Sequence, residues 1–307
     1  MNLNINIHSE VAVALKAGQP VVALESTLIT HGFPRPDNLR VAQAIEQTVR
    51  DQGAVPATIA ILSGKIHVGL TTAQLNQLAE AYDVRKCSTR DLPIVVAQQG
   101  HGATTVAATM VIARLAGIRI FVTGGIGGVH RGDDHDISTD LIELGRIPIT
   151  VVCGGMKAFL DLPRTLEFLE TQAVPVLGYK TDEMPAFYSR LSGLPVVERV
   201  DTPQVVADMI EARDQLQLSN AILLTVPVPE ADEWPAEQAG AVITQALIEA
   251  EQNNITGKSI SPFLLSRIAI LSGERSKRAN ESLLLNNARV GAQVAVALCK
   301  KPQPVYV

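Results

Sequence analysis

One lysine stands where it could act as a nucleophile. In TVVCGGMKAFLDLP (residues 150–163), a run typical of a buried strand ends at two glycines and is followed by Lys157. Apolar surroundings lower the pKa of an amine, and a neutral lysine attacks electrophilic carbon. The glycines leave room beside it for a substrate. The alternative, which is commoner, is a lysine whose stem packs while its ammonium reaches water.

A glycine-rich segment, TGGIGGVHRGDDHDISTD (residues 123–140), follows another strand-like run. Glycines let backbone N–H groups approach an anion closely. Asp133, Asp134, Asp136 and Asp140 offer the hard oxygen ligands that suit magnesium or manganese. The alternative is a flexible acidic loop, which the density of glycines directly after a strand disfavours.

Two nucleotide-binding motifs are excluded by single residues. A GxGxxG fingerprint built on Gly125 and Gly127 would need a third glycine where the chain has His130. The sequence GKS occurs at residues 257–259, but a P-loop would need glycine at position 252, which is Gln252. Neither motif is therefore assigned.

Two further segments place charge beside strand-like runs. Glu25 lies inside ALESTLITHG, and a carboxylate there needs a partner or has a raised pKa. It is either a structural acid paired with a buried base or a functional group. The segment RKCSTRDLP carries Arg85, Lys86, Arg90 and Asp91 before an expected strand. It is either a solvated charged loop or a binding site for a phosphate.

The elements that position these groups follow from the alternation of β-branched runs with longer helical patterns. Strands are expected at residues 20–27, 57–69 (a strand and hairpin), 91–100, 118–125, 147–155, 174–180 and 221–229. Helices are expected at residues 38–53, 71–82, 104–117, 138–146, 163–172 and 202–216, and nearly throughout the chain from residue 236.

This alternation predicts an α/β protein with a three-layer α/β/α arrangement. Its central sheet would be mostly parallel or mixed, with helices on both faces and a helical C-terminal region. The sequence contains no linker, low-complexity segment or evident repeat, so we expect one domain over residues 1–307. In such sheets ligands bind at the carboxyl ends of the strands, where the polar segments above are expected to lie.

Composition excludes several classes of partner. The chain has 307 residues, 47% of them hydrophobic, a net charge of −5 and no basic block, which argues against nucleic-acid binding. Its three cysteines form no CxxC pair, which favours reduced thiols in a cytosolic protein. Neither a signal peptide nor a membrane-spanning run is evident. We expect a cytoplasmic protein that binds a small molecule, no nucleic acid and no membrane.

A series of long motifs resembles, in order, those of the pseudouridine-5′-phosphate glycosidase family, which is related to the indigoidine synthase A proteins. The motifs are VVALESTLITHG, GAVPATIAIL, TRDLP, GATTVAATM, TGGIGGVHRG, DISTDL, VVCGGMK, SPFLL and NNA. The resemblance extends from about Pro20 to the C-terminal helix. It implies an enzyme that reversibly cleaves pseudouridine 5′-phosphate, at the C–C bond between uracil C5 and ribose C1′, to uracil and ribose 5-phosphate. It also implies a divalent metal, typically Mn²⁺, and a homotrimer.

The same resemblance implies roles for individual residues. Lys157 matches the covalent nucleophile, Glu25 the proton donor and Asp136 the metal ligand. The matched substrate-binding positions are Lys86, Val106, Ser138, Thr139 and Asp140, and Asn280 matches an active-site asparagine. The chain departs from the family at Val226, where an asparagine is expected, and in a shorter loop at residues 131–136.

The chemistry of C–C cleavage favours the same lysine. A carbon leaving group needs an electron sink, which an amine that becomes an iminium supplies and a pair of carboxylates does not. We therefore expect Lys157 to form an imine with the ring-opened ribose while Glu25 moves protons. Lys86 and the backbone of residues 124–128 would hold the phosphate.

Two other readings remain open from the sequence. A metal-dependent lyase or aldolase acting on another sugar phosphate would share the lysine, the phosphate site and the metal. A regulatory protein that only binds a metabolite is the third possibility. It would not need a nucleophile, an acid and a metal ligand together.

Overall fold

The structure is a computed structural model that describes residues 5–132 and 136–300. In this part of the chain eleven strands form one sheet, in the order β1-β4-β3-β2-β7-β8-β11-β9-β10, with β6 beside β3 and β5 beside β6. The strands are β1 (Ile5–Ile7), β2 (Val21–Leu24), β3 (Val55–Leu62), β4 (Lys65–Val68), β5 (Arg85–Cys87), β6 (Gly102–Thr104), β7 (Ile120–Val122), β8 (Thr150–Cys153), β9 (Val176–Tyr179), β10 (Glu198–Val200) and β11 (Ile222–Thr225). β3 pairs antiparallel with β4 and β6, whereas the other neighbours in this order are parallel. The predicted mostly parallel, mixed sheet is confirmed.

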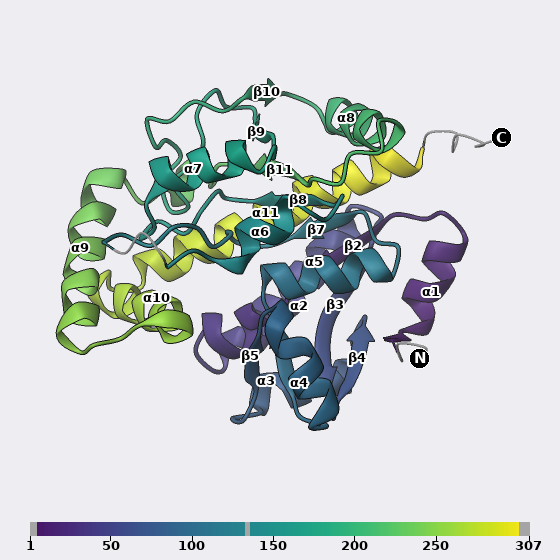
Figure 1. Ribbon diagram of the computed structural model, residues 1–307, viewed down its shortest axis with the longest axis horizontal. Coiled ribbons are helices and arrows are strands. Elements are labelled where there is room, and N and C mark those ends of the chain that lie inside the picture. The colour runs from purple at the N-terminus through teal and green to yellow at the C-terminus, as the bar shows by residue number, and fades with distance from the viewer. Residues whose placement is uncertain (1–4, 133–135, 301–307) are drawn as a thin grey trace.

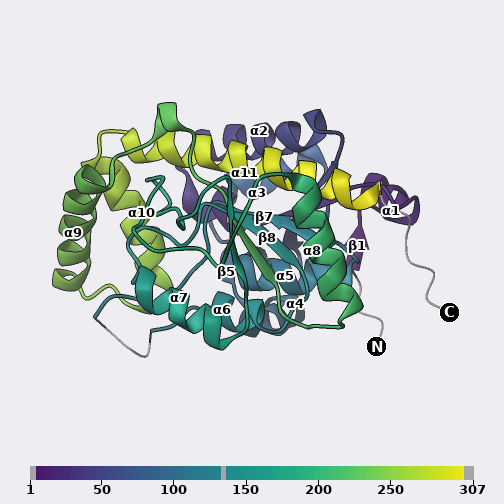
Figure 2. The same cartoon turned by 90° about the horizontal axis from the view of Figure 1, so that it is seen from above.

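Helices cover both faces of the sheet. They are α1 (Ser9–Lys16), α2 (Asp37–Asp51), α3 (Thr72–Glu80), α4 (Leu92–Ala97), α5 (Val106–Leu115), α6 (Thr139–Leu144), α7 (Leu162–Thr171), α8 (Pro203–Gln215), α9 (Ala236–Gln252), α10 (Ile260–Leu271) and α11 (Arg275–Cys299). Figure 1 shows α11 running across the molecule, with α9 and α10 at one end. Figure 2 shows α2 and α11 above the sheet and α5, α6 and α7 below it. The expected three layers and helical C-terminal region are therefore present.

The central strands explain why their sequences are continuously apolar. In β7, Ile120 and Val122 pack into the core under α2 and α11, whereas Phe121 packs into the core on the opposite face. In β8, Val152 and Val151 divide between the faces in the same way. Side chains alternate along a strand, so a sheet covered on both sides needs apolar residues at every position.

The prediction of a strand over residues 91–100 is wrong. This segment forms the short helix α4, with Pro93 in its first turn, where a missing N–H breaks no helical hydrogen bond. Val95 is buried while Ile94 and Val96 are exposed, which is the pattern of a helix with one covered face. A short apolar run of this kind carries too few periods for its sequence to separate the two conformations.

The helix α11 lies unusually close to the sheet at one point. A Cβ atom added at Gly291 would stand 2.3 Å from Cγ2 of Val122 in β7, so only glycine fits there without displacing its neighbours. The closeness lets Asn287, one turn earlier, reach the backbone just beyond β7. Within the described residues, no helix is long and apolar enough to cross a membrane.

Candidate active site

Three of the predicted polar segments meet at one edge of the sheet. Glu25 follows β2, residues 124–128 follow β7, and Lys157 lies just beyond β8. β2, β7 and β8 are adjacent and parallel, so their carboxyl ends lie side by side. The location expected from the general rule for α/β sheets is therefore the observed one.

Two hollows open at this edge and share part of their walls. Hollow A has a volume of about 540 Å³, and its apolar lining is Leu28, Phe33, Phe187, Pro262, Leu265 and Leu284. Hollow B has a volume of about 1090 Å³, and it is lined by polar side chains that include Ser88, Arg90, Thr105, His130, Ser138 and Thr139.

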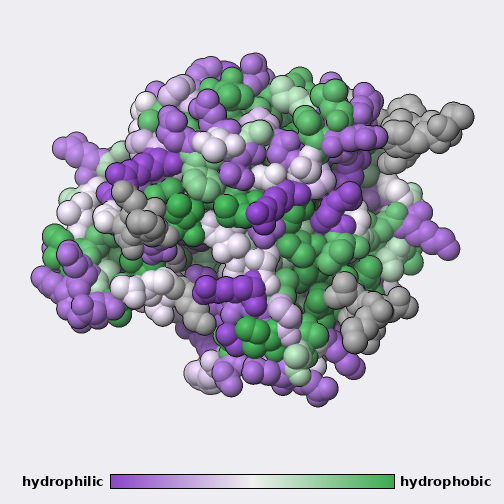
Figure 3. Space-filling view, viewed as in Figure 1, coloured by the Kyte–Doolittle hydropathy of each residue, from purple (hydrophilic) through white to green (hydrophobic). Residues whose placement is uncertain are grey.

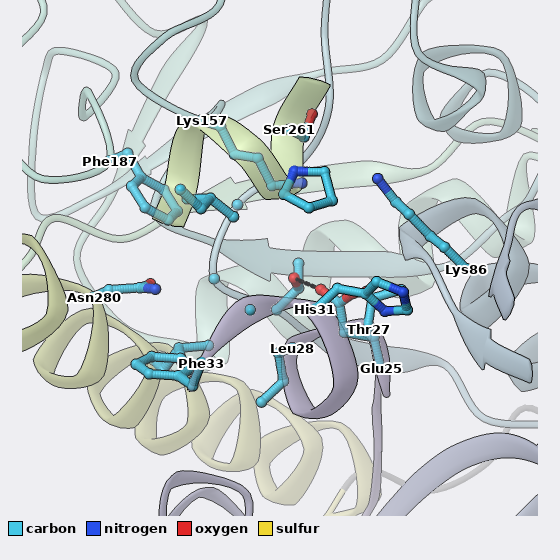
Figure 4. A pocket seen from close by; sticks show the side chains of 17 residues that line it. Glu25, Thr27, Leu28, His31, Phe33, Lys86, Lys157, Phe187, Ser261 and Asn280 are labelled. Carbon is cyan, nitrogen blue, oxygen red and sulfur yellow. Dashed lines mark hydrogen bonds between the residues drawn. The ribbon is translucent and has the colours of Figure 1, made fainter. Parts of the chain in front are cut away.

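The side chains common to both hollows are Glu25, Thr27, Lys86, Lys157 and Ser261. The ammonium ends of Lys157 and Lys86 point into the same space, across from Glu25 and Thr27 (Figure 4). A ligand that extends from one hollow to the other would thus pass between an amine and a carboxyl group.

Glu25 is a buried acid with two hydroxyl partners. Its side chain is 8% exposed, and the hydroxyl groups of Thr27 and Thr123 donate hydrogen bonds to its two carboxylate oxygens. Burial raises the pKa of Glu25, while the positive charge of Lys157 and the two hydroxyl bonds act in the opposite direction. A carboxyl group with a raised pKa can hold a proton and give it to a substrate.

Lys157 is placed by paired glycine turns. Gly155 has φ +89° and lies against the carbonyl of Pro185, and the Gly154 N–H donates to the carbonyl of Gly124 at 2.8 Å. The Lys157 N–H donates to the Ile126 carbonyl at 3.2 Å. The turn after β8 is thus bound to the turn after β7.

The surroundings of Lys157 differ from those predicted. Apolar neighbours were expected, yet the side chain is only half-buried and its charge acts on the carboxyl group of Glu25. The space beside Gly154 and Gly155 is filled by the protein itself rather than left for a substrate. A Cβ at Gly154 would be 2.3 Å from Cδ1 of Leu283, and one at Gly155 would be 2.3 Å from the carbonyl oxygen of Pro185. The nearby thiol of Cys153 is an unsuitable nucleophile, because burial raises its pKa to about 12.

Lys86 lies in the short strand β5 and Arg90 in the turn that follows it, and an acid braces this segment. Asp91 is buried, and its carboxylate accepts hydrogen bonds from Arg85 Nε at 3.0 Å and from the Ser88 N–H at 3.2 Å. Lys86 lines both hollows and Arg90 lines hollow B, so a phosphate site in this segment stays a prediction. Asp91 is structural, whereas the two cations face the site.

The glycine-rich turn offers fewer backbone amides to an anion than the sequence suggested. The Ile126 N–H donates to the Gly155 carbonyl, and the Gly127 N–H donates to Asp140 Oδ2 at 2.8 Å. The second oxygen of Asp140 accepts the Ala107 N–H at 2.9 Å, at the start of α5. Asp140 lines hollow B, and it also ties the turn to α5.

The remaining predicted substrate positions gather in hollow B. Val106 and Thr139 stand at the first residues of α5 and α6, and Ser138 caps α6 by accepting the Asp140 N–H at 3.2 Å. All three line the hollow. The N-terminal ends of α5 and α6 therefore border hollow B, where the Ala107 N–H is already bonded to Asp140 and the Asp140 N–H to Ser138.

Asp136 also lines hollow B, beside His130. Its backbone carbonyl accepts the His130 N–H at 3.0 Å, and burial lowers the pKa of His130 while the charge of Asp136 opposes this. In residues 5–132 and 136–300, no group of three or more histidine, cysteine or acidic side chains could hold a metal ion. Asp133 and Asp134 lie outside the described residues. A single carboxylate facing an open hollow fits an ion bound mainly by water and substrate oxygens, as Mg²⁺ often is.

Asn280 comes from the far end of the chain. It projects from α11 into hollow A, where a Cβ at Gly124 would be 3.5 Å from its Oδ1 (Figure 4). Two turns further along the same helix, the fully buried Asn287 donates to the carbonyl of Thr123 at 2.9 Å. One face of α11 therefore contributes Asn280 to the wall of hollow A. Through Asn287 it also holds Thr123, whose hydroxyl donates to Glu25.

Sequence reasoning assigned no role to four polar side chains that line hollow A. Thr27, His31, Thr123 and Ser261 lie within the quoted motifs, but no role was assigned to them. A signal was available, since each stands within six residues of a predicted functional residue or in SPFLL. Val226, the departure noted above, is buried and lines neither hollow, so its side chain forms no wall of the site.

The fold and site define a class of protein. It is an α/β protein with a lysine–carboxyl pair at the carboxyl edge of its sheet, between a pocket with many apolar side chains and a mainly polar pocket. The family model described as "Indigoidine synthase A like protein" matches residues 10–297, and the chain belongs to this family.

Curated relatives are named pseudouridine-5′-phosphate glycosidase. The protein from Methylobacterium nodulans is 54% identical, with 94% of this chain and 86% of that one covered. The protein from Geobacillus kaustophilus is 51% identical, with 96% and 99% covered.

Two solved structures share the fold closely. The prealnumycin C-glycosynthase AlnA in complex with ribulose 5-phosphate has a TM-score of 0.89 and 42% identity, covering 97% of this chain and 98% of that one. An indigoidine synthase A-like protein from Thermotoga maritima has a TM-score of 0.90 and 34% identity, covering 98% of each chain.

Proposed function

We propose that this protein is a pseudouridine-5′-phosphate glycosidase, which reversibly cleaves the C–C bond between uracil and ribose 5-phosphate. The observation that carries the proposal is the placement of Lys157 and Glu25 at the junction of the two hollows. The names of relatives that share about half of its residues over nearly the whole chain support it. The sugar-phosphate complex of AlnA supports a phosphorylated pentose as ligand.

The two hollows suit the two halves of this substrate. Hollow A, with its apolar walls and the amide of Asn280, suits a flat base with a polar edge. Hollow B, with Arg90, hydroxyl groups and two helix N-termini, suits the phosphate. The bond between C1′ and C5 would then lie beside the amine and the carboxyl group.

The reaction divides into steps that these two residues can perform. Glu25 gives its proton to the ribose ring oxygen as the C1′–O4′ bond breaks, and electrons of the uracil ring form a C5=C1′ double bond. The neutral amine of Lys157 adds to C1′ and returns that electron pair to the ring.

The C–C bond breaks in the next step. The added nitrogen loses a proton and C5 gains one, after which the nitrogen lone pair forms C=N and the electrons of the C1′–C5 bond return to the ring. Water hydrolyses the imine, which releases ribose 5-phosphate and restores Lys157. Glu25, left ionised after the first transfer, is placed to take a proton from this water.

Release of uracil from pseudouridine 5′-phosphate tests the proposal. The purified protein should liberate uracil and ribose 5-phosphate in equal amounts, and it should form the nucleotide from both products. A metal-dependent lyase acting on another sugar phosphate would instead cleave pentose or hexose phosphates and ignore the C-nucleotide. The apolar hollow A would then have no occupant, which is why we favour the glycosidase.

We propose that Asp136 is the one protein carboxylate that binds a divalent cation, with Mn²⁺ the expected metal. Its position at the edge of hollow B, open to water and to a bound phosphate, supports this. Such an ion would supply positive charge near the phosphate.

Replacing Asp136 by alanine should weaken Mn²⁺ binding and lower turnover by about 10–100-fold, because the ion loses its anionic ligand. Calorimetric titration with Mn²⁺ measures the first effect and uracil release the second. The control is Asp182→Ala, because Asp182 is 78% exposed and bonded only to Arg199 among the described contacts. Unchanged titration and turnover in Asp136→Ala would place the metal elsewhere.

The phosphate should be needed for efficient turnover. Removing a charge-assisted hydrogen bond costs about 1.5–3 kcal/mol, so Lys86→Ala should lower kcat/KM for the nucleotide by about 10–100-fold. For unphosphorylated pseudouridine, already a poor substrate, kcat/KM should change much less. Equal turnover of nucleoside and nucleotide by the unmodified enzyme would remove the anion-binding interpretation of hollow B.

We propose that the protein works as a homotrimer in the cytoplasm. Figure 3 shows apolar side chains on the surface over α4 and α5. Leu115 of α5 is 54% exposed, and Ile94 and Val96 of α4 are also exposed. A surface of this kind supports contact with another copy of the chain. The thiols of Cys153 and Cys299 support a reducing compartment. Sedimentation velocity measures the assembly directly.

A further inference from the structure

His31 occupies a position in hollow A that none of the roles above explains. It belongs to a π-helical turn, Leu28–Gly32, that directly follows Glu25 and Thr27 at the end of β2. Turns of this kind are rare and occur frequently at functional sites. Figure 4 shows the imidazole beside Thr27, on the side of the hollow opposite the ends of the two lysines.

The imidazole is held by its neighbour in the turn. Thr30 Oγ1 lies 2.5 Å from Nδ1 of His31. When the Thr30 hydroxyl donates this bond, Nδ1 is the acceptor and the ring proton sits on Nε2. The second nitrogen then carries an N–H donor.

The charge state of this ring suits a neutral ligand. Burial lowers the pKa of His31, and the nearby ammonium of Lys86 lowers it further. The charged groups that share its hollow are Glu25, Lys86 and Lys157. With two cations already present, a neutral imidazole adds a hydrogen-bond donor without adding charge.

Elimination leaves few polar groups for a base in hollow A. Among the described residues, three polar side chains line this hollow but not hollow B: His31, Thr123 and Asn280. The hydroxyl of Thr123 donates to Glu25. His31 and Asn280 therefore remain to meet the polar edge of a ring.

Uracil presents more polar groups than one amide can satisfy. Its ring has two carbonyl oxygens with an N–H between them. The amide of Asn280 can accept from that N–H and donate to one adjacent carbonyl, as amides do with paired donor and acceptor edges. The other carbonyl still needs a donor, because a buried acceptor without a partner is costly.

We propose that His31 is a specificity-determining residue, which donates its Nε2–H to the uracil carbonyl that Asn280 does not meet. This assignment rests on the proposed function and adds to it a second point at which the base is recognised. It explains why a π-helical turn directs an imidazole into hollow A.

The test uses the synthetic direction, with ribose 5-phosphate and a free base. His31→Ala should raise the KM for uracil by about tenfold, the loss expected for one hydrogen bond. His31→Gln, which keeps an N–H donor, should recover part of it. His101→Ala is the control, because His101 lines neither hollow.

Thiouracils identify the contact, because a thiocarbonyl accepts hydrogen bonds more weakly than a carbonyl. The unmodified enzyme should use both 2-thiouracil and 4-thiouracil less well than uracil. His31→Ala should erase the penalty for one of them and keep the penalty for the other. A KM for uracil within twofold of the unmodified enzyme, or two unchanged penalties, would overturn the proposal.

A base-free reaction separates this proposal from the function on which it rests. Borohydride should trap ribose 5-phosphate on Lys157 in the absence of uracil, and His31→Ala should not slow this trapping. If trapping is lost in His31→Ala, the residue supports the catalytic centre as a whole and the proposal fails. If the unmodified enzyme forms no nucleotide from uracil, the proposed function itself is wrong.

Discussion

Replacing Lys157 by arginine should abolish uracil release, with a loss of at least about a thousandfold. Arginine keeps the positive charge beside Glu25, but its guanidinium stays protonated and cannot form an imine. Lys157→Ala should be equally inactive, since both variants lack the nucleophile. Uracil release under single-turnover conditions measures the loss, because it reports the chemical step without product release.

The covalent intermediate gives a direct measurement. Borohydride added during turnover should reduce the imine and leave a ribose phosphate adduct on the tryptic peptide that contains Lys157. The matched controls are Lys86→Arg, at the other lysine of the junction, and Lys180→Arg, away from both hollows. An active Lys157→Arg variant, or an adduct mapped to Lys86 or Lys180, would show that the nucleophile is another residue.

Glu25→Gln should lower turnover by about 10²–10⁴-fold, the usual contribution of a positioned general acid. Glutamine has nearly the same shape and can still meet Thr27 and Thr123, so the pocket should stay intact. Activity of the unmodified enzyme should fall as pH rises through the raised pKa of Glu25, because the acid form is lost. An active Glu25→Gln variant would exclude proton donation by this residue.

The same substitution should stabilise the fold at neutral and alkaline pH. Burial raises the pKa of Glu25 above its ordinary value of 4.5, so the folded protein holds a proton that the unfolded chain has already released. Between 4.5 and the raised pKa, the free energy of unfolding therefore decreases as pH increases. Glu25→Gln does not ionise and escapes this loss.

Denaturant unfolding at a series of pH values measures the difference. The advantage of Glu25→Gln over the unmodified protein should be absent below pH 4.5, grow through the window and then stay constant. The opposite sign would mean that Lys157 and the two threonine hydroxyls outweigh burial. Thr27→Val, which removes one of those hydroxyl bonds, should enlarge the loss in the unmodified protein.

The sequence predicted the parts of the fold in which periodicity and turn chemistry agree. The hairpin over residues 57–69 appears as β3 and β4, joined by a turn in which Ser63 and Gly64 both have positive φ. The sequence favours a cap at Thr71 or Thr72 before this helical pattern, and Thr71 caps α3 through a reciprocal bond with Gln74.

Short strands were the main elements that the sequence did not reveal. β1, β5, β6 and β10 have three residues each, too few for a period of two to be visible. Each of them forms because a neighbouring strand supplies its hydrogen-bond partners. Those partners lie in other parts of the chain, so the local sequence does not reveal the strand. Their positions in the sheet order are hidden for the same reason.

The candidate site also contains some residues that the sequence predicted and others that it did not. Glu25 and Lys157 were predictable because each follows a recognisable buried strand, and parallel strands end together. The hydrogen bond from Thr123 to Glu25 was not predictable, because it joins residues that are 98 positions apart in the sequence. His31 was hidden by its turn, since no sequence pattern marks a π-helical turn.

The close approach at Gly291 has a consequence for how this enzyme could change its substrate over time. Asn280 stands on the same stiff helix, about 16 Å along the axis from that contact. A methyl group at residue 291 would press on Val122, so α11 would tilt and carry the amide of Asn280 with it. Evolution, or a directed-evolution experiment, could thus widen or narrow the pocket for the leaving group from a site that never meets a ligand. Acceptance of larger aromatic aglycones would then arise with Lys157 and Glu25 untouched.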